Sequence, residues 1–166
     1  MLETLNLVVV AAAAYSVVIA VVLYLRSQRQ KRRAVTLDYI KRWNQELVRA
    51  EIIGLSGEVA RDVSDYRSII KKLSDEDLNG KQLSQLLRTW DFFEELAIAI
   101  FFMEADEEMA KEFFFYALIG TYRSSEPAID VYRKRLNNKA LYKNLERLYG
   151  KWAFDKNYVL VREVAK

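Results

Sequence analysis

Apolar and polar positions divide the chain into two unequal parts, and the first is an uncharged, almost wholly apolar stretch from Leu5 to Leu25. A helix needs roughly 20 such residues to cross the ~30 Å hydrocarbon core of a bilayer. A secretory signal carries its basic residues before the apolar run, whereas here they follow it. The pattern predicts an uncleaved single-pass membrane helix, and a signal peptide or a buried helix of a soluble protein is the alternative.

A basic cluster directly follows the apolar stretch and predicts the orientation of the chain. Cytoplasmic flanks of membrane helices carry an excess of Lys and Arg. We therefore expect the N-terminus outside and the C-terminal part in the cytoplasm. Each basic residue near an anionic leaflet is worth about 1 kcal/mol, so the same flank is expected to bind anionic lipid. The cluster consists of Arg26, Arg29, Lys31, Arg32 and Arg33.

Small residues recur every fourth position within the predicted span, at Ala12, Ser16 and Ala20. Such a ridge allows two helices to approach closely in lipid. It predicts that the span also packs against another copy. The alternative is that alanine is simply common in membrane helices.

The rest of the chain shows apolar positions at helical spacing. One proline and five glycines in 166 residues leave little room for a turn-rich β fold. We therefore predict an all-α protein, in which the membrane helix precedes a compact cytoplasmic bundle of about five to six helices. The expected division is 1–33 for the anchor with its basic flank, 34–154 for the helical domain and 155–166 for a tail, whose choice between helix and strand stays open. The helical patterns cover 36–50, 55–73, 81–103, 113–120, 127–136 and 139–152.

Two helix boundaries rest on local signals. Pro127 follows Ser124-Ser125-Glu126 and is acceptable in the first turn of a helix, so a new helix is expected to start there and to end at Asn137-Asn138. The acidic residues 104–112 are expected to form a solvated turn between two largely buried helices, with some of them as helix-start charges. Their spacing lacks the pattern of a cation-binding loop.

Composition excludes most catalytic chemistry. The chain has no histidine and no cysteine, which excludes disulfides, zinc sites of His/Cys type and Ser-His-Asp triads. We expect no metal, no cofactor and no enzymatic activity. The net charge of +3 is also uninformative about the domain, because residues 1–33 carry five basic and one acidic side chain and the remainder carries 21 basic and 22 acidic ones.

A basic stripe lies near the C-terminus and is expected to face solvent on the last helix. One interpretation is an ordinary solvated face, or a surface that pairs with the acidic residues 104–112 of this chain or of a neighbouring one. The other is a face that binds a nucleotide-type ligand, RNA or an anionic membrane. The aromatic residues of 90–116 are interpreted as packing. The stripe consists of Arg133, Lys139, Lys143, Arg147 and Lys151.

Two segments suggest a family. The segment 86–100 (LLRTWDFFEELAIAI), the acidic turn and aromatic-rich helix after it, and the segment 127–135 (PAIDVYRKR) resemble an uncharacterised bacterial family of domains of unknown function. In its members one N-terminal membrane helix precedes an all-helical domain, and a Pro-x-Ile stretch ends in arginine, here Pro127, Ile129 and Arg133. The resemblance covers about 36–152 and implies a fold and a place at the bacterial inner membrane. It implies no activity.

Two functional hypotheses follow from these patterns. The first is a membrane-tethered interaction module that recruits a protein partner or assembles with itself at the inner membrane. The second is a ligand-gated membrane effector, of the kind used in antiviral defence, whose basic C-terminal face senses an anionic nucleotide-type signal.

Overall fold

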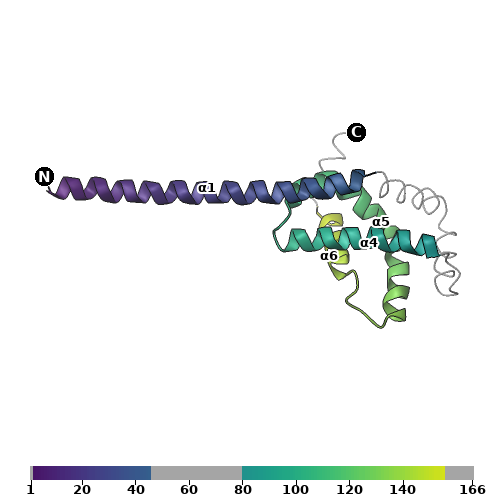
Figure 1. The fold of residues 1–166 in the computed structure, drawn as a ribbon. Helices are drawn as coiled ribbons and strands as arrows, with labels where there is room; N and C mark the ends of the chain where they lie inside the picture. The colour runs from purple at the N-terminus through teal and green to yellow at the C-terminus, as the bar shows by residue number, and fades with distance from the viewer. Residues whose placement is uncertain (1, 46–79, 156–166) are drawn as a thin grey trace.

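The computed structural model describes residues 2–45 and 80–155, with side chains from residue 13 and from residue 86 onward in these two segments. This part of the chain is all-α, without strands, and the predicted class is confirmed (Figure 1). The helix expected over 55–73 and all but the first residue of the tail 155–166 lie outside it. The described residues form four helices, α1 (Leu2–Asn44), α4 (Gly80–Phe101), α5 (Glu107–Arg135) and α6 (Lys143–Ala153). This count is lower than predicted, in part because α5 unites the helices expected over 113–120 and 127–136.

Helix α1 is one uninterrupted element of 43 residues, which corresponds to about 65 Å at 1.5 Å per residue. It continues through residues 33 and 34, where the sequence suggests a division. Its N-terminal half projects away from the other helices, and its C-terminal part lies along them (Figure 1). Within residues 2–45 and 80–155, no helix combines the length and apolar character that crossing a membrane requires. The predicted span over Leu5–Leu25 is therefore not confirmed.

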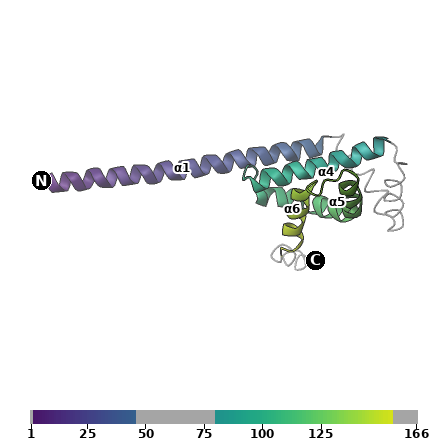
Figure 2. The same cartoon turned by 90° about the horizontal axis from the view of Figure 1, so that it is seen from below.

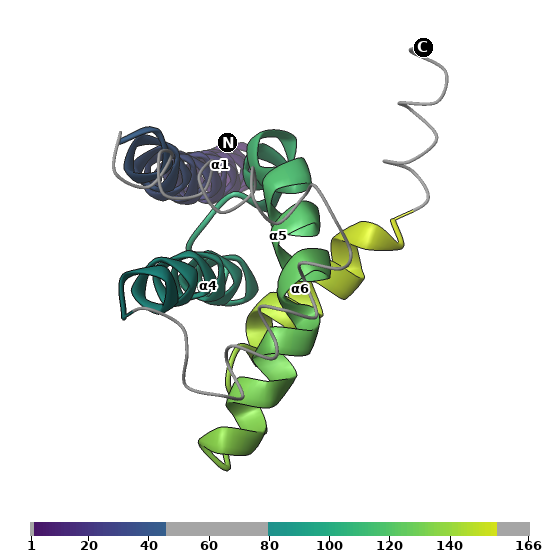
Figure 3. The ribbon, with the colours of Figure 1, turned by 90° about the vertical axis from the view of Figure 1, so that its right-hand side faces the viewer.

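Helices α1 and α4 run side by side in opposite directions, and α5 and α6 cover one flank of this pair (Figures 2 and 3). Trp43 anchors the end of α1 in the core. Its ring centroid lies 5.1 Å from that of Phe92, 5.1 Å from that of Phe93 and 5.6 Å from that of Phe114. Helix α1 is therefore an integral part of the helical domain as well as its N-terminal extension.

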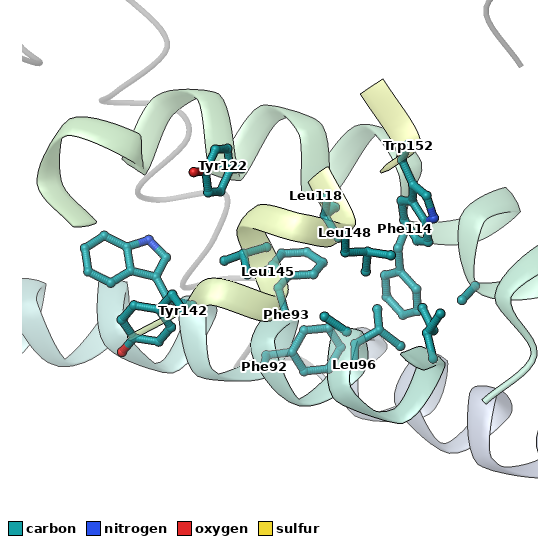
Figure 4. Packing of buried hydrophobic residues seen from close by; sticks show 14 of the residues in the cluster. Phe92, Phe93, Leu96, Phe114, Leu118, Tyr122, Tyr142, Leu145, Leu148 and Trp152 are labelled. Atoms are coloured by element: carbon teal, nitrogen blue, oxygen red, sulfur yellow. The ribbon is translucent and has the colours of Figure 1, made fainter. Parts of the chain in front are cut away.

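The core is formed by one face of each helix (Figure 4). The apolar stripe of α6 faces the core, because Leu145, Leu148 and Trp152 are completely buried. Side chains of α4 and α5 meet this stripe from the other side. The aromatic residues of 90–116 only partly follow the packing interpretation, since Phe102, Phe113 and Tyr116 are exposed. The remaining fully buried large side chains of α4 and α5 are Trp90, Phe93, Leu96, Phe114, Leu118 and Ile129.

The expected helix start at Pro127 is wrong. Pro127 lies inside α5, which is continuous from Glu107 to Arg135. A proline in a helix interior lacks the N–H that would bond to the carbonyl four residues earlier. Buried residues before and after it, among them Tyr122 and Ile129, hold the two halves in one helix. Core packing on both sides therefore outweighs the local start signal.

The two ends of the segment between α5 and α6 differ in how well the sequence predicts them. Helix α5 ends as expected. Asn137 has a positive φ of 49°, and the Asn138 N–H donates to the carbonyl of Arg133 at 2.9 Å, which together form a Schellman-type C-cap. Helix α6 begins at Lys143 and not at 139, because Tyr142 adopts a left-handed conformation with φ 56°. The basic stripe predicted on the last helix is thus shortened, because Lys139 lies in the connection before α6.

Candidate functional site

The candidate site is the junction between α1 and the loop that joins α4 to α5. Thr36 of α1 is completely buried there. Its hydroxyl accepts a hydrogen bond from the backbone N–H of Asp106 at 2.8 Å and donates to the carbonyl of Arg32 at 3.1 Å. A single buried hydroxyl therefore joins two segments that are 70 residues apart in sequence.

Asp106 organises this loop through both of its carboxylate oxygens. Oδ1 accepts from the backbone N–H of Met109 at 3.1 Å and so caps the N-terminus of α5. Oδ2 lies 3.3 Å from Nε of Arg33 on α1. Acidic side chains in this position also interact favourably with the positive end of the helix dipole. The acidic segment is thus a helix start, as expected, and Glu104, Glu108 and Glu112 are exposed. Its additional role as a docking point for α1 is not predicted by the sequence.

The end of α4 forms a tight C-cap with an unusual residue at its key position. The N–H of Glu104 donates to the carbonyl of Ala99 at 2.8 Å, and the N–H of Met103 donates to that of Ile100 at 3.0 Å. This is a Schellman motif, whose left-handed residue is usually glycine. Here that residue is Met103, with φ 59°. A side chain with a Cβ is disfavoured in this conformation by about 1–2 kcal/mol.

This C-cap exposes two apolar side chains beside the basic flank of α1. Phe102 is 74% exposed and Met103 is 66% exposed. A guanidinium nitrogen of Arg32 lies 3.9 Å from the sulfur of Met103. In the ribbon, the α4–α5 loop is the part of the domain nearest to the projecting half of α1 (Figure 1).

A cavity of about 610 Å³ opens at the same junction. Its apolar wall comes from α1, from the end of α4 and from Met103, and its polar wall mixes basic and acidic groups. One acid, Glu107, is already engaged, because its carboxylate accepts from Lys151 at 2.6 Å and from the indole N–H of Trp152 at 3.2 Å. The lining residues are Leu25, Gln28, Arg29, Arg32, Ile100, Phe101, Met103, Ala105, Asp106, Glu107, Glu108 and Lys151.

The basic flank predicted from the sequence divides into two groups. Arg32 and Arg33 contact the α4–α5 loop, as described above. Arg26, Arg29 and Lys31 are exposed on α1 at the boundary between the apolar half and the docked part of the helix. The flank therefore supplies both docking contacts and an exposed cationic surface.

The proposed small-residue ridge lies on the projecting half of α1. Ser16 and Ala20 are exposed, and the side chain of Ala12 lies outside the described residues. Its role in packing stays a prediction.

The basic C-terminal stripe is partly engaged within the chain. Arg133 is 14% exposed, and its guanidinium donates to the Leu141 carbonyl at 2.8 Å and to Glu146 at 2.8 Å. It also lies 3.4 Å from Asp130. Arg133 therefore fastens α5 to the start of α6.

The other members of the stripe differ in their surroundings. Lys151 pairs with Glu107, and the guanidinium carbon of Arg147 lies 4.2 Å from the ring centroid of Phe101, a cation–π geometry. Lys139 and Lys143 are exposed. The interpretation as a partner of the acidic residues 104–112 thus holds for Lys151, whereas Arg133 pairs with acids outside that segment. Ligand binding by this face stays a prediction.

A second polar centre holds the start of α6 against α4. The carboxylate of Glu94 accepts from the backbone N–H groups of Leu145 at 2.6 Å and Asn144 at 3.3 Å, and from the Asn144 amide at 2.8 Å. Tyr142 donates its hydroxyl to Asp91 at 3.0 Å. Burial, together with the Asp91 carboxylate, raises the pKa of Tyr142 well above its ordinary value.

Most residues that build these two centres are not visible in the sequence. Thr36 and Glu94 each act on a segment at least 50 residues away in sequence, so no local pattern reveals them. Asp106 carries a usable signal, because an Asp followed by two Glu residues is a typical helix start. Met103 carries none, since Met is not a residue that marks a C-cap.

The fold and junction define a class of all-α protein in which one long N-terminal helix is both a core element and a projecting stalk. The family described as Domain of unknown function (DUF4760) matches residues 7–152, and the chain belongs to this family. The matched region begins within the apolar part of α1 and ends in α6. Neither the curated proteins nor the solved structures contain a match to the chain.

Proposed function

We propose that the protein is a membrane-tethered helical module that holds a partner protein, or a second copy of itself, at the cytoplasmic face of a bacterial inner membrane. The N-terminal apolar half of α1 serves as a single-pass anchor with its N-terminus outside. The remaining helices form the cytoplasmic interaction domain. The proposal contains no catalytic step.

The observation that carries the proposal is the all-round apolar surface of the projecting half of α1. The apolar run begins at Leu5, and its side chains are described from residue 13 on. Successive residues on a helix are about 100° apart, so the consecutive positions from Val21 to Leu25, all at least 43% exposed, cover every side of the helix. A helix that is apolar all round requires apolar surroundings on every side. A single partner helix covers only one stripe, whereas lipid covers the whole circumference.

The basic flank supports the proposed orientation. Arg26, Arg29 and Lys31 are exposed immediately after the apolar run, and cytoplasmic flanks are the ones enriched in Lys and Arg. The domain is docked directly behind this flank through Thr36 and Trp43. A rigid connection of this kind fixes how the domain is presented to cytoplasmic partners.

An exposed aromatic pair on α5 supports the interaction role. Phe113 is 44% exposed and Tyr116 is 58% exposed, and residues three apart share one face of a helix. Aromatic residues are enriched at protein interfaces relative to other surfaces. The pair is therefore the surface that we assign to partner binding.

Membrane fractionation tests the anchor. The full chain, expressed in a bacterium, is expected to remain in the membrane pellet after washing with alkaline carbonate, which removes peripheral proteins. Val18→Lys combined with Val21→Lys is expected to move the chain to the supernatant, because both positions lie within the span and a Lys costs up to about 2.5–3.5 kcal/mol at a span centre. Val18→Leu with Val21→Leu is the matched control. Extraction of the unmodified chain by carbonate would contradict the proposal.

Chemical cross-linking in detergent tests the interaction. We expect the full chain to cross-link to itself or to a co-purifying protein, and Phe113→Ser with Tyr116→Ser to reduce this product several-fold. Leu136→Ser, which removes an equally exposed apolar side chain elsewhere, is expected to have no effect. A single uncross-linked chain with no associated protein would contradict the interaction role.

A further inference from the structure

We propose that the tip formed by Phe102 and Met103 lies in the headgroup layer of the anionic leaflet from which α1 emerges, so that the domain rests on the membrane surface in one fixed orientation. This inference rests on the proposed membrane anchor and adds a second contact to it. It assigns a lipid surface, and not a protein, to this part of the domain.

The distance along α1 places the tip at the outer edge of the headgroup layer. Met103 lies beside Arg32, which is seven residues after Leu25 and therefore about 10 Å further along the helix axis. The headgroup region adds about 5–8 Å on each side of the hydrocarbon core. The loop that joins α4 to α5 is the part of the domain nearest to the projecting half of α1 (Figure 1). When Leu25 is at the edge of the hydrocarbon, the level of Arg32 is therefore within about 2–5 Å of the headgroup layer, a gap shorter than a Phe or Met side chain.

The backbone at Met103 provides the second argument. The chain ends two helices with the same Schellman motif, and at the end of α5 the left-handed position is occupied by Asn137. Asn adopts this conformation more readily than Met, for which it is disfavoured. Met103 is also 66% exposed, so neither backbone preference nor core packing explains a methionine here. Its side chain contacts Arg32 within the chain, and the proposed contact with lipid accounts for the large part that stays exposed.

The charges around the tip favour an anionic leaflet. Arg26, Arg29 and Lys31 are exposed on the adjacent part of α1, and each contributes about 1 kcal/mol near an anionic surface. Two exposed acids, Glu104 and Glu108, lie in or beside the same loop and offset part of this attraction. The apolar pair is therefore expected to provide the contact, and the basic flank the preference for anionic lipid.

Single-cysteine labelling of the full chain tests the inference directly, because the natural sequence contains no cysteine. Phe102→Cys, Leu136→Cys and Val18→Cys each receive an environment-sensitive fluorophore. The labelled chains are reconstituted in vesicles of phosphatidylglycerol and phosphatidylcholine in equal parts. Lipids with a quencher near the headgroup, lipids with a quencher deep in the acyl chain, and aqueous iodide then report the depth of each label.

The three labels separate the two proposals. We expect the Val18 label to be quenched from the acyl chains, the Phe102 label to be quenched several-fold more strongly by headgroup quencher than the Leu136 label, and the Leu136 label to be the most accessible to iodide. If the Val18 label is quenched but the Phe102 and Leu136 labels behave alike, the tip contact is overturned and the anchor stands. If the Val18 label shows no quenching from the acyl chains, the anchor fails and the inference fails with it.

Met103→Gly, introduced into the labelled Phe102→Cys variant, supplies a second measurement. A variant that merely fails to fold would not give the expected result. Glycine suits the left-handed position, so the variant is expected to unfold at a higher temperature. It removes the apolar side chain, so iodide quenching of the Phe102 label is expected to rise several-fold. A stabilised variant whose label stays as protected as before would overturn the role assigned to Met103.

Discussion

The hydroxyl of Thr36 accepts the backbone N–H of Asp106 at 2.8 Å in a fully buried position, and this bond joins α1 to the loop from which α5 starts. Thr36→Val keeps the shape of the side chain and leaves that N–H without its acceptor. An unsatisfied buried donor costs about 1–3 kcal/mol. We expect the free energy of unfolding of the full chain in detergent to fall by about this amount.

Thr36→Ser is the control for that change, because it retains the hydroxyl. Hydrogen exchange locates the effect: the amide of Asp106 is expected to exchange faster in Thr36→Val and to stay protected in Thr36→Ser. Equal stability of Thr36→Val and the unmodified chain would show that the bond does not hold the junction.

The Glu94 carboxylate is expected to stabilise the start of α6. Glu94→Ala removes the acceptor for the Asn144 and Leu145 N–H groups, and loss of a helix cap costs about 0.5–2 kcal/mol. Glu95→Ala is the matched control. Glu95 pairs with Arg42 at 3.0 Å with both side chains about half exposed, and such pairs contribute about 0–1 kcal/mol. Urea unfolding of both variants distinguishes these sites, and a larger loss for Glu95→Ala would refute the assignment.

Alkaline pH is expected to destabilise the domain through Tyr122. Burial, with a smaller effect of Glu146, raises the pKa of Tyr122 from 10.0 to about 12. The folded state therefore retains the phenol proton to higher pH than the unfolded state does. This contribution to stability is complete below pH 10 and is lost between about pH 10 and 12, at up to about 1.4 kcal/mol per pH unit.

Tyr122→Phe removes this contribution to the pH dependence. The decline of the unfolding free energy between about pH 10 and 12 is expected to be shallower in the variant, while Tyr142, whose pKa is also raised, maintains part of it. Tyr116→Phe, at an exposed site, is the control. An unchanged slope in Tyr122→Phe would count against a buried, protonated phenol.

Pro127→Ala is expected to stabilise α5. The alanine supplies the missing N–H to the carbonyl of Arg123 and removes a residue that disfavours helix interiors by about 3 kcal/mol. The greater flexibility of the unfolded chain offsets about 0.4–1 kcal/mol of that gain. A net increase of about 2–2.6 kcal/mol in thermal unfolding experiments is therefore expected, with the exposed neighbour Glu126→Ala as a near-neutral control. Destabilisation would mean that the proline sets a bend that the core requires.

The sequence predicts those parts of the fold that depend on local periodicity and on strong cap residues. The buried face of α6 follows from Leu145, Leu148 and Trp152, and the end of α5 follows from Asn137. The start signal at Pro127 is misleading because the packing of Tyr122 and Ile129, which keeps α5 continuous, is a property of the folded core.

The candidate site is less predictable than the fold. The basic residues of its α1 side are visible in the sequence, but the loop against which Arg32 and Arg33 pack is about 70 residues away. Thr36 is one polar residue in a mixed helix until Asp106 is placed beside it. Only the folded chain shows that Met103 occupies a position that favours glycine.

Because α1 is a single helix, the angle of each residue around its axis is fixed relative to the side that carries the domain. At about 100° per residue, Ser16 and Ala20 lie about 200° and 160° around the axis from Thr36, which is the side opposite the docked helices. Two stalks that pack through these small residues would place their domains on the outer sides of the pair. The pair would then be wide and back-to-back, with both membrane-facing tips pointing toward the same leaflet and neither domain blocking the other.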